Sequence, residues 1–551
     1  MNNLIQTKFW YKNYLHFMKN FFGSIPKSQI FLFVLLDAFL SSYIVFTRYL
    51  AYSTIFISKS HTLCCLIFSI LLLIIVFHLL IYICWKLRSF KIRVNNEKSK
   101  LNLKLFIISF SICIFILSMN LLAYYPGGVS NDNCTQWDQV QNFRFDNWHP
   151  AIHTFLIYLI TRIYNHYSFV IFVQILIFSI GVALLICDLK SWGIKNICLT
   201  IVYGLIVINM TTRNIMMYAW KDTALTILIL FIFTHTINIY LSNGLWLRKY
   251  TNLIGFSICI ALATLIRHNG FFYTLPLLAL ILYIYVKNVR EVLYSAILSV
   301  ILILAIRFPL YSSLKVTYPD QGYVESVGLP MTIMCNVMKN NPDALSEKTK
   351  SFLNEIATDQ QWKTKYKSGN YNSVKFAFNT DRVIKKIPIK DFIKMTINTI
   401  ISDKRNSFIA ALELTCMVWE TKGDPKGVIY VANEGNPIKY EYKNTKYNKL
   451  GKIFINTIYD FSNLPILNKI LMMIGIHILF LMIFGLISYY KNGIKSLIFV
   501  VPTITYNFGT MLLLCGEDYR FFQFNCVIFI ASCLMLFAKN INTSKKSNIK
   551  K

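Results

Sequence analysis

Acidic side chains are scarce in this sequence: 25 Asp and Glu residues stand against 56 Lys and Arg residues among 551, a formal net charge of +31. The sequence also lacks a P-loop, a dinucleotide-binding fingerprint, a Ser-centred nucleophile elbow and the Cys/His spacing of a zinc site. These absences leave no motif for nucleotide binding or for a serine nucleophile. No internal repeat is visible, which weighs against a transporter built from two equal halves.

The chain is far more apolar than a soluble domain. Hydrophobic residues make up 55% of it and aromatic residues 15%, and the mean hydropathy is +0.50, which together indicate a polytopic membrane protein. In such a protein the basic excess reports cytoplasmic loops, so we expect a lipid bilayer, that of the cell membrane, and no nucleic acid as its partner. Most of the 13 cysteines lie in apolar runs, as small hydrophobes. A bridge between Cys335 and Cys416, which lie outside such runs, stays open.

The apolar runs predict an all-α protein with about twelve transmembrane helices. In the loop of residues 86–104, seven Lys and Arg residues oppose only Glu97, which marks the loop as cytoplasmic. The same rule places the N-terminus and the basic C-terminal tail in the cytoplasm. The predicted spans are 30–46, 63–85, 105–124, 169–187, 197–209, 223–240, 253–266, 271–286, 292–311, 466–490, 496–515 and 521–537.

Three regions follow from this pattern. Residues 1–311 hold the first nine spans, and residues 466–551 hold the last three spans and the tail. Between spans nine and ten, residues 312–465 contain no apolar run long enough to cross a bilayer. Their pattern is mostly helical, so we expect an extracytoplasmic domain or lid there.

Residues 125–150, after the third predicted span, hold three carboxylates: Asp132, Asp138 and Asp146. Because the basic loop before that span is cytoplasmic, this stretch is expected on the outer face. A carboxylate there can act as general base towards a substrate hydroxyl if it keeps its charge. Asp132, beside the turn at Gly127, is the catalytic candidate. The alternative is a solvated Asp that caps a turn or helix.

Several cations stand at predicted outer turns, where Lys and Arg should be rare. Ionisable residues near membrane depth are costly and tend to mark function, and guanidinium and ammonium groups together suit phosphate. Each residue alone has a plainer interpretation, such as snorkelling to lipid headgroups or pairing with a neighbour. The cations are Arg213, Lys221, Arg267 with His268, Arg307 and Arg520.

A divalent cation is a further alternative, because His149 and His153 are four residues apart and Asp146 could supply an oxygen ligand. Two His and one Asp without a third strong ligand form a weak pattern. A hydrogen-bonding role for His149 is therefore favoured, and no metal site is assigned. The substrate-binding candidates are Asp138, His149, Arg213, Lys221, Asp222, Arg267, His268 and Arg520.

Short motifs from residue 102 onward resemble a group of polytopic bacterial membrane proteins found with surface-polysaccharide genes, which are similar in plan to the GT-C class of glycosyltransferases. The motifs are Tyr125, Pro126, Gly127 and Gly128 with Asp132 and Gln136; His149 and Pro150; Lys221 and Asp222; Arg267, His268, Asn269 and Gly270; and Gly328, Leu329 and Pro330.

The resemblance implies a GT-C-like fold and transfer of a sugar from a polyprenyl-phosphate-linked donor to a cell-surface glycan or glycolipid acceptor, with Asp132 as general base. One departure stands out: the class usually places this Asp in the first outer loop, which here, at residues 51–62, has no acid. Two alternatives remain: a polysaccharide polymerase or ligase that uses the same cations, and a lipid-linked glycan transporter. The transporter would need polar groups at mid-membrane, where Asp37 and His235 are the few candidates.

Overall fold

The computed structural model describes residues 2–53, 55–286, 289–318, 324–375, 377–378, 380–422, 446–462, 464–513, 515–516 and 518–540. The chain is almost entirely helical. Its only strands among the described residues are β1 (Ile92–Val94) and β2 (Ala538–Asn540), which pair in parallel with Ile92 opposite Ala538. Of the predicted basic tail, Lys539 lies in β2, and the residues from 541 on lie outside the described residues.

The helices before the predicted outer domain are α1 (Asn2–Gly23), α2 (Lys27–Arg48), α3 (Lys59–Lys86), α4 (Leu103–Ala123), α5 (Asn131–Asn142), α6 (Ala151–Thr161), α7 (Tyr167–Ser191), α8 (Asn196–Ile208), α9 (Met210–Ile215), α10 (Lys221–Leu241), α11 (Tyr250–Ile266), α12 (Phe271–Ile284) and α13 (Val289–Ala305), which a π-helical turn (Ile306–Leu310) and α14 (Tyr311–Ser313) continue.

The remaining helices are α15 (Gly328–Asn340), α16 (Glu347–Ile356), α17 (Asp359–Lys365), α18 (Asn372–Lys375), α19 (Thr380–Ile384), α20 (Ile389–Ser402), α21 (Lys404–Thr415), α22 (Lys446–Ser462), α23 (Pro465–Met472), α24 (Ile474–Asn492), η9 (Gly493–Phe499), α25 (Val501–Met511), η10 (Tyr519–Phe522) and α26 (Phe524–Leu536).

Every predicted span is helical, and eight of the resulting helices are long and apolar enough to cross a membrane. These eight confirm an all-α protein of membrane character; twelve crossings stay a prediction. The other four predicted spans correspond to the shorter helices α8, α11, α12 and α25, because η9 continues α24 in one of the eight candidates, Ile474–Phe499. The 13 residues of α8 reach roughly 20 Å at 1.5 Å per residue, less than the hydrocarbon thickness of about 30 Å.

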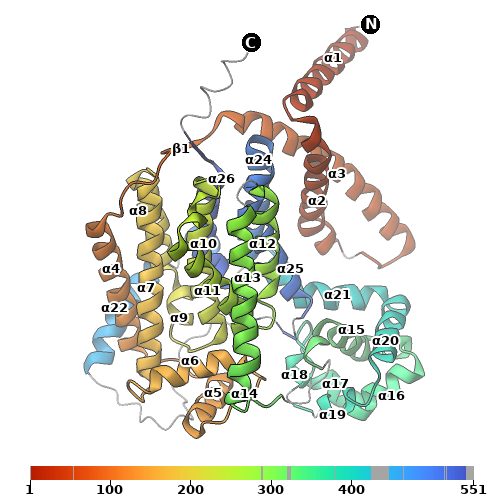
Figure 1. The fold of residues 1–551 in the computed structure, drawn as a ribbon. Helices are drawn as coiled ribbons and strands as arrows, with labels where there is room; N and C mark the ends of the chain where they lie inside the picture. The colour runs from red at the N-terminus through yellow and green to blue at the C-terminus, as the bar shows by residue number, and fades with distance from the viewer. Residues whose placement is uncertain are drawn as a thin grey trace.

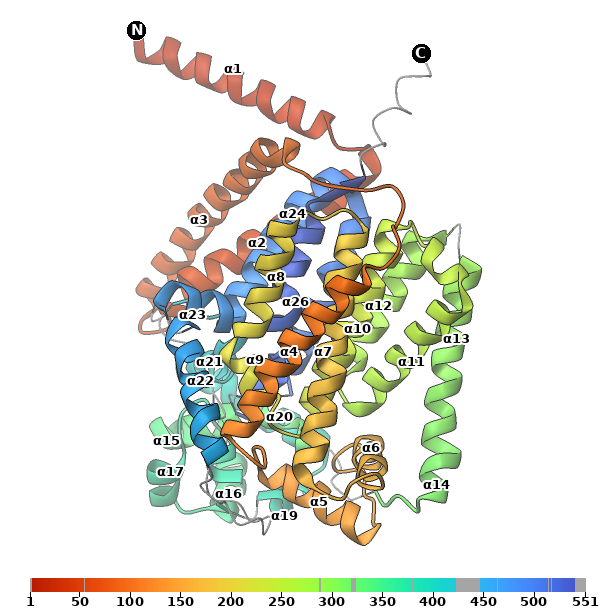
Figure 2. The ribbon, with the colours of Figure 1, turned by 90° about the vertical axis from the view of Figure 1, so that its left-hand side faces the viewer.

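The long helices form one bundle whose two ends differ (Figures 1 and 2). At one end lie α5, α6 and the domain of α15–α21; we call this the site end. At the opposite end lie α1, β1 and β2. The first and last described elements therefore lie on the same side of the bundle, away from the site end.

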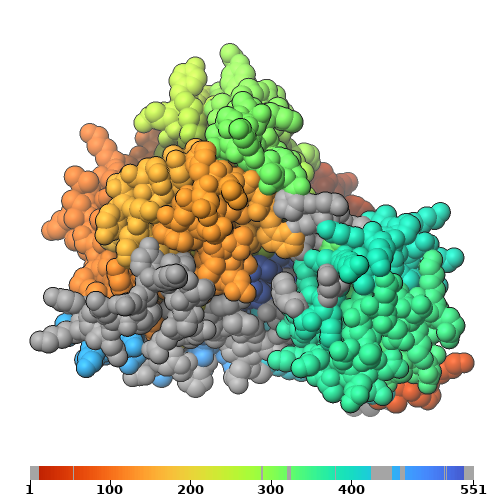
Figure 3. Space-filling view, turned by 90° about the horizontal axis from the view of Figure 1, so that it is seen from below, coloured from red at the N-terminus to blue at the C-terminus, as the bar shows by residue number. Residues whose placement is uncertain are grey.

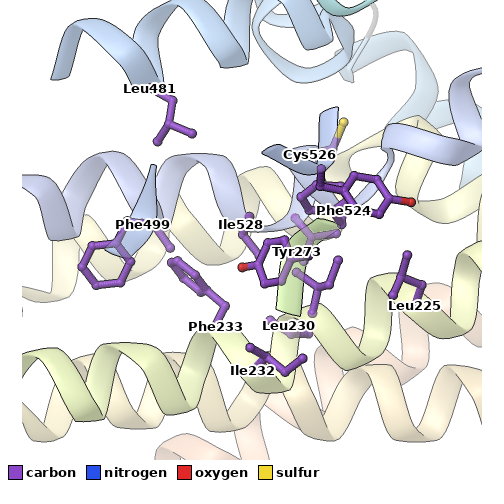
Figure 4. Close-up of a cluster of buried hydrophobic side chains, with 14 of the residues drawn as sticks. Leu225, Leu230, Ile232, Phe233, Tyr273, Leu481, Phe499, Phe524, Cys526 and Ile528 are labelled. Carbon is purple, nitrogen blue, oxygen red and sulfur yellow. The ribbon is translucent and has the colours of Figure 1, made fainter. Parts of the chain in front are cut away.

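The bundle core is built by α10, α12, α24, η9 and α26, whose side chains meet in Figure 4. Leu230, Phe233 and Ile528 are 0–1% exposed. Lipid is as apolar as these side chains, so close packing, and not exclusion of water, has to stabilise such contacts. Cys526 lies among them as a free thiol. Because α26 is central, the preceding turn η10 is held firmly at the site end.

Residues 324–415 form a helical unit with a core of its own, separate from the core of the bundle. We call it the inserted domain. Its core gathers Met334, Phe352, Trp362 and Phe392 from four of its helices. Cys335 is buried in this core and Cys416 in that of the bundle, and both thiols are free. The bridge considered from the sequence is therefore not formed.

Two elements near the end of the predicted outer domain differ from expectation. Helix α22 packs along α4, and a Cβ at Gly451 would lie 2.6 Å from the backbone nitrogen of Ala123. Part of the segment assigned to the outer domain thus lies against the bundle. The predicted span 466–490 is two helices, α23 and α24, because the backbone is extended at Met473.

Candidate active site

Helix α5 begins with a capping box that fixes its first turn. The hydroxyl of Ser130 accepts the backbone N–H of Asn133, and the Asn133 side chain accepts the N–H of Ser130 at 3.1 Å. Both capping residues are also tied to the segment before α10: Trp220 Nε1 donates to Ser130 Oγ at 2.8 Å, and Asn133 Nδ2 donates to the carbonyl of Ala219 at 2.9 Å. The first turn of α5, which carries Asp132, is therefore held beside the start of α10.

The glycine turn before α5 allows this close approach. Gly128 N–H donates to the carbonyl of Met217 at 2.8 Å, and its own carbonyl accepts the hydroxyl of Tyr167 at 2.8 Å. A Cβ on Gly128 would lie 2.3 Å from the ring of Tyr218. A larger residue would push the loop away from the segment before α10, so the glycine helps to place Asp132.

Asp132 forms an ion pair with Arg520, which lies 388 residues later in η10. Arg520 Nη1 donates to Asp132 Oδ2 at 2.8 Å. The same guanidinium lies 2.9 Å from Asp518 and 3.7 Å from Asp222, measured from its Nε to the carboxylate oxygens. One arginine thus links three carboxylates from α5, α10 and the turn before η10.

Asp222 is the inner member of this network and is only 2% exposed. It also pairs with Arg267, whose guanidinium lies 4.4 Å from the ring centre of Phe521. Arg267 Nε donates to Asn269 at 2.5 Å, and Asn269 donates to Thr510 of α25 at 2.7 Å. Asp222 therefore fixes the positions of the guanidinium groups of Arg267 and Arg520.

The network faces a cavity of about 330 Å³ between the bundle and the inserted domain. Seen from the site end, Figure 3 shows dark blue atoms of the C-terminal region between the orange α5–α6 region and the inserted domain. Four cationic side chains and one carboxylate line the cavity. The lining residues are Asp132, Trp148, His149, Lys221, Arg267, His268, Asn269, Asn372, Lys375, Thr510, Leu513, Cys515, Arg520 and Phe521.

The charges around Asp132 keep it ionised. Burial raises the pKa of Asp132, but the cations Arg520 and Lys221 lower it further than burial raises it, so the net shift is downward. Burial and the nearby charge of Lys221 lower the pKa of His149 to about 3. His149 is therefore neutral near pH 7, and Lys221 Nζ donates to its Nδ1 at 3.2 Å. Burial followed by Lys221 also lowers the pKa of His268.

Six of the nine residues predicted for the site line this cavity: Asp132, His149, Lys221, Arg267, His268 and Arg520. Asp222 does not line the cavity itself; it pairs with Arg267 and Arg520, which do.

Asp138 and Arg213 are not brought to the cavity. Asp138 lies on a different side of α5 from Asp132, so it does not reach the cavity. It is exposed and accepts a hydrogen bond from the side-chain amide of Asn142 at 2.9 Å. Arg213 is 1% exposed within the bundle, where its carbonyl accepts the side chain of Asn120.

The residues of the metal alternative have other partners. Asp146 accepts Gln139 Nε2 at 2.7 Å and the backbone N–H of Trp148 at 2.9 Å, which shapes the loop before α6. His153 is bonded to Gln136 at 2.9 Å. In the part of the chain that the structure describes, no group of three or more His, Cys, Asp or Glu side chains could hold a metal ion.

The inserted domain adds two residues that the sequence did not indicate, Asn372 and Lys375 from α18. Lys375 is only 7% exposed. The domain is docked here by a bond from Asn372 N–H to the carbonyl of Cys515 at 3.0 Å. A buried lysine in an otherwise solvated domain is unusual, but the sequence alone gives no sign that Lys375 is buried. Comparisons with family models, with curated proteins and with solved structures found no match to this chain.

Proposed function

We propose that this protein is a membrane glycosyltransferase that moves a sugar from a polyprenyl-phosphate-linked donor to a glycan or glycolipid acceptor at the site end, with that end on the outer face of the cell membrane. The observation that carries the proposal is the cavity in which the Asp132 carboxylate stands among Lys221, Arg267, Lys375 and Arg520. One ionised carboxylate amid several cations suits removal of a proton beside a bound phosphate.

In the proposed reaction the acceptor hydroxyl attacks the anomeric carbon and its proton passes to Asp132. The new bond joins the acceptor oxygen to that carbon. The bond between the carbon and the phosphate oxygen breaks, and its electrons stay on the phosphate. Lys221 and the arginines then stabilise the added negative charge as it develops.

Arg520 gives the base a means of changing its strength. The Arg520 guanidinium lies 2.8 Å from Asp132 and lowers the pKa of that carboxyl, against the rise that burial causes. A donor phosphate that accepts from Arg520 would share this charge, so Asp132 would become a better proton acceptor when the donor is bound. The ion pair between Arg520 and Asp132 thus supports a base that is activated by its substrate.

The position of the cavity favours transfer over transport. Its polar groups lie at one end of the bundle. Asp37, a mid-membrane candidate of the transporter alternative, is buried with Ser41 donating to it at 3.2 Å. His235 accepts the indole N–H of Trp246 at 3.1 Å.

The decisive experiment compares the lipid-linked glycans of a strain that lacks the protein with those of its parent by mass spectrometry. Transfer predicts that an unmodified acceptor accumulates and that the intact gene restores the modified product. An unchanged glycan profile would overturn the proposal.

A further inference from the structure

The inserted domain carries an exposed apolar stripe on α20. Its five isoleucines are 39–64% exposed, although they belong to a helix whose other side is buried in the domain core. Their spacing of three and four residues places them side by side along the helix. The members of this isoleucine stripe are Ile389, Ile393, Ile397, Ile400 and Ile401.

The exposed surface of α20 is divided lengthwise. Phe392 and Met395 face the domain core at 2% exposure each. At 100° per residue the isoleucine stripe follows on one flank of that core face, and Lys390, Lys394 and Asn398, all exposed, continue from its far edge. A helix that met only water would be polar over its whole exposed arc. The lengthwise division is typical of a helix that lies in a membrane interface.

Helix α21, which packs on α20, lies near the end of a candidate membrane span. Phe408 of α21 packs against Phe46 of α2, with ring centres 6.3 Å apart, and against Phe56 at 5.7 Å. Helix α2 is one of the eight candidate spans, and it carries exposed apolar side chains such as Phe31, Leu35 and Phe39. Figure 1 accordingly shows α21 just beyond the site-end terminus of α2, with α20 on the outer side of α21.

Aromatic residues with polar tips gather at the same level. The ring of Trp419 lies 6.2 Å from Phe46 and 6.1 Å from Tyr52. Trp and Tyr concentrate where a membrane meets water. Figure 3 shows the inserted domain projecting to one side of the bundle, so the bilayer around the bundle would face this projecting part.

We propose that α20 is an interfacial helix: its isoleucine stripe inserts into the boundary between headgroups and acyl chains, and Lys390 and Lys394 bind anionic lipid headgroups. The inference does not depend on the proposed reaction. It explains why an apolar stripe is tolerated outside the bundle, and it gives the inserted domain, which supplies Lys375 to the cavity, a second attachment to the membrane.

Photocrosslinking of the full chain in nanodiscs of phosphatidylcholine and phosphatidylglycerol tests this inference. Benzoyl-phenylalanine replaces Ile397 and, as the matched control, the exposed Thr364 of α17 in the same domain. We expect at least about fivefold more lipid adduct at position 397, because only that position enters the interface. Equal yields at the two positions, or adducts at 397 to a second copy of the chain, would overturn the proposal.

A second arm tests the headgroup charge. With the crosslinker at position 397, the double change Lys390→Glu and Lys394→Glu should lower the ratio of phosphatidylglycerol to phosphatidylcholine adducts. A cation near an anionic surface changes lipid preference by about fivefold per charge. Lys363→Glu with Lys365→Glu, on α17, is the control and should leave the ratio unchanged. An unchanged ratio in the α20 variant would contradict binding of anionic headgroups. Because every readout is lipid contact, these outcomes are independent of any transfer activity.

Discussion

Two ion-pair networks, one at each end of α10, each contain a buried carboxylate and differ in their surroundings. At the opposite end, Lys98 pairs with Asp188 at 2.6 Å, and the second oxygen of Asp188 accepts Asn238 of α10 at 2.5 Å. Trp192 donates in turn to Asn238 at 2.9 Å. At the site end, Asp222 in the first turn of α10 holds Arg267 and Arg520, and Arg520 reaches Asp132.

The difference lies in what each network faces. The polar groups around Asp188 satisfy one another, and the cation of Lys98 lies against the ring of Trp246 at 4.2 Å. The site-end network instead borders a cavity of about 330 Å³ that also presents Lys221 and Lys375. A buried ion pair alone is weak evidence for function. An ion pair beside an accessible cavity with additional cations is far stronger evidence.

The largest effect that separates the two networks is expected from Arg520→Ala compared with Lys98→Ala. Loss of Arg520 leaves Asp132, Asp222 and Asp518 close together without their shared cation, which should cost about 3 kcal/mol of stability. It should also lower transfer at least about 100-fold. Lys98→Ala should lower the Tm and leave transfer within about twofold. The measurements are Tm of the purified proteins and lipid-linked glycans of complemented deletion strains. Equal loss of transfer in Arg520→Ala and Lys98→Ala would indicate that the site-end network has only a structural role.

A smaller effect tests whether the inserted domain belongs to the site. Lys375→Ala should weaken binding of farnesyl phosphate about tenfold, since a hydrogen bond to a charged group contributes about 1.5 kcal/mol. The Tm should change little. Binding is measured by titration with the purified protein in nanodiscs, with Lys363→Ala on the exposed side of the same domain as control. Unchanged affinity in Lys375→Ala would remove the inserted domain from the ligand site.

The pH dependence of stability gives a subtler distinction. The pKa of His149 in the folded protein is about 3, well below its ordinary value of 6.5. Between these values the unfolded chain binds the proton and the folded chain does not, so stability falls as the pH drops from about 6.5, by at most about 1.4 kcal/mol per pH unit.

His149→Gln should therefore flatten the decline in Tm between pH 7 and pH 5 relative to the parent protein. The lowered pKa of Asp132 acts the same way but at lower pH, because its contribution is complete above the ordinary carboxyl pKa and is lost only as the pH falls through the folded value. Parallel Tm curves for the variant and the parent would mean that His149 is not held neutral.

The smallest effect is expected from Asp138→Asn, which lies on the same helix as Asp132. Asp138 is exposed and pairs only locally with Asn142 among the described contacts. Transfer should stay within about twofold of the parent, and the Tm should stay within about 2 °C of it. A large loss of transfer would show that the acceptor extends over this side of α5.

Much of the architecture follows from apolar run lengths, which is why the predicted spans all appear as helices. The breaks at Met473 and between η9 and α25 were missed because apolar residues continue across them, while only tertiary packing decides where the backbone turns. The cationic part of the site was predicted from Lys and Arg residues at outer turns, where such residues should be rare, as at Arg267 and Arg520. The same rule selected Arg213, since the rule cannot distinguish a cation that faces a cavity from one enclosed by helices.

Lys375 shows that the sequence can also miss a residue that lines the cavity. It lies in a short helix of an ordinary mixed-charge segment, and only the docking of Asn372 on Cys515 brings it to the cavity. The sequence predicted Asp132 as the general base and Asp222 as a substrate-binding residue, but it did not indicate that Asp222 pairs with Arg267 and Arg520. Their separate roles, one behind the arginines and one facing the cavity, depend on contacts across hundreds of residues.

The most direct test of the central claim is Asp132→Asn, which replaces one carboxylate oxygen by an NH2 group and so removes the charge and keeps the shape. The variant is expressed in a strain that lacks the parent gene, and the lipid-linked glycans of that strain are measured. The purified variant is also titrated with farnesyl phosphate. We predict that binding stays within about threefold while transfer falls 10²–10⁴-fold, roughly the contribution of a general base. Full transfer by Asp132→Asn would contradict a catalytic carboxylate and favour a polymerase or ligase that needs none.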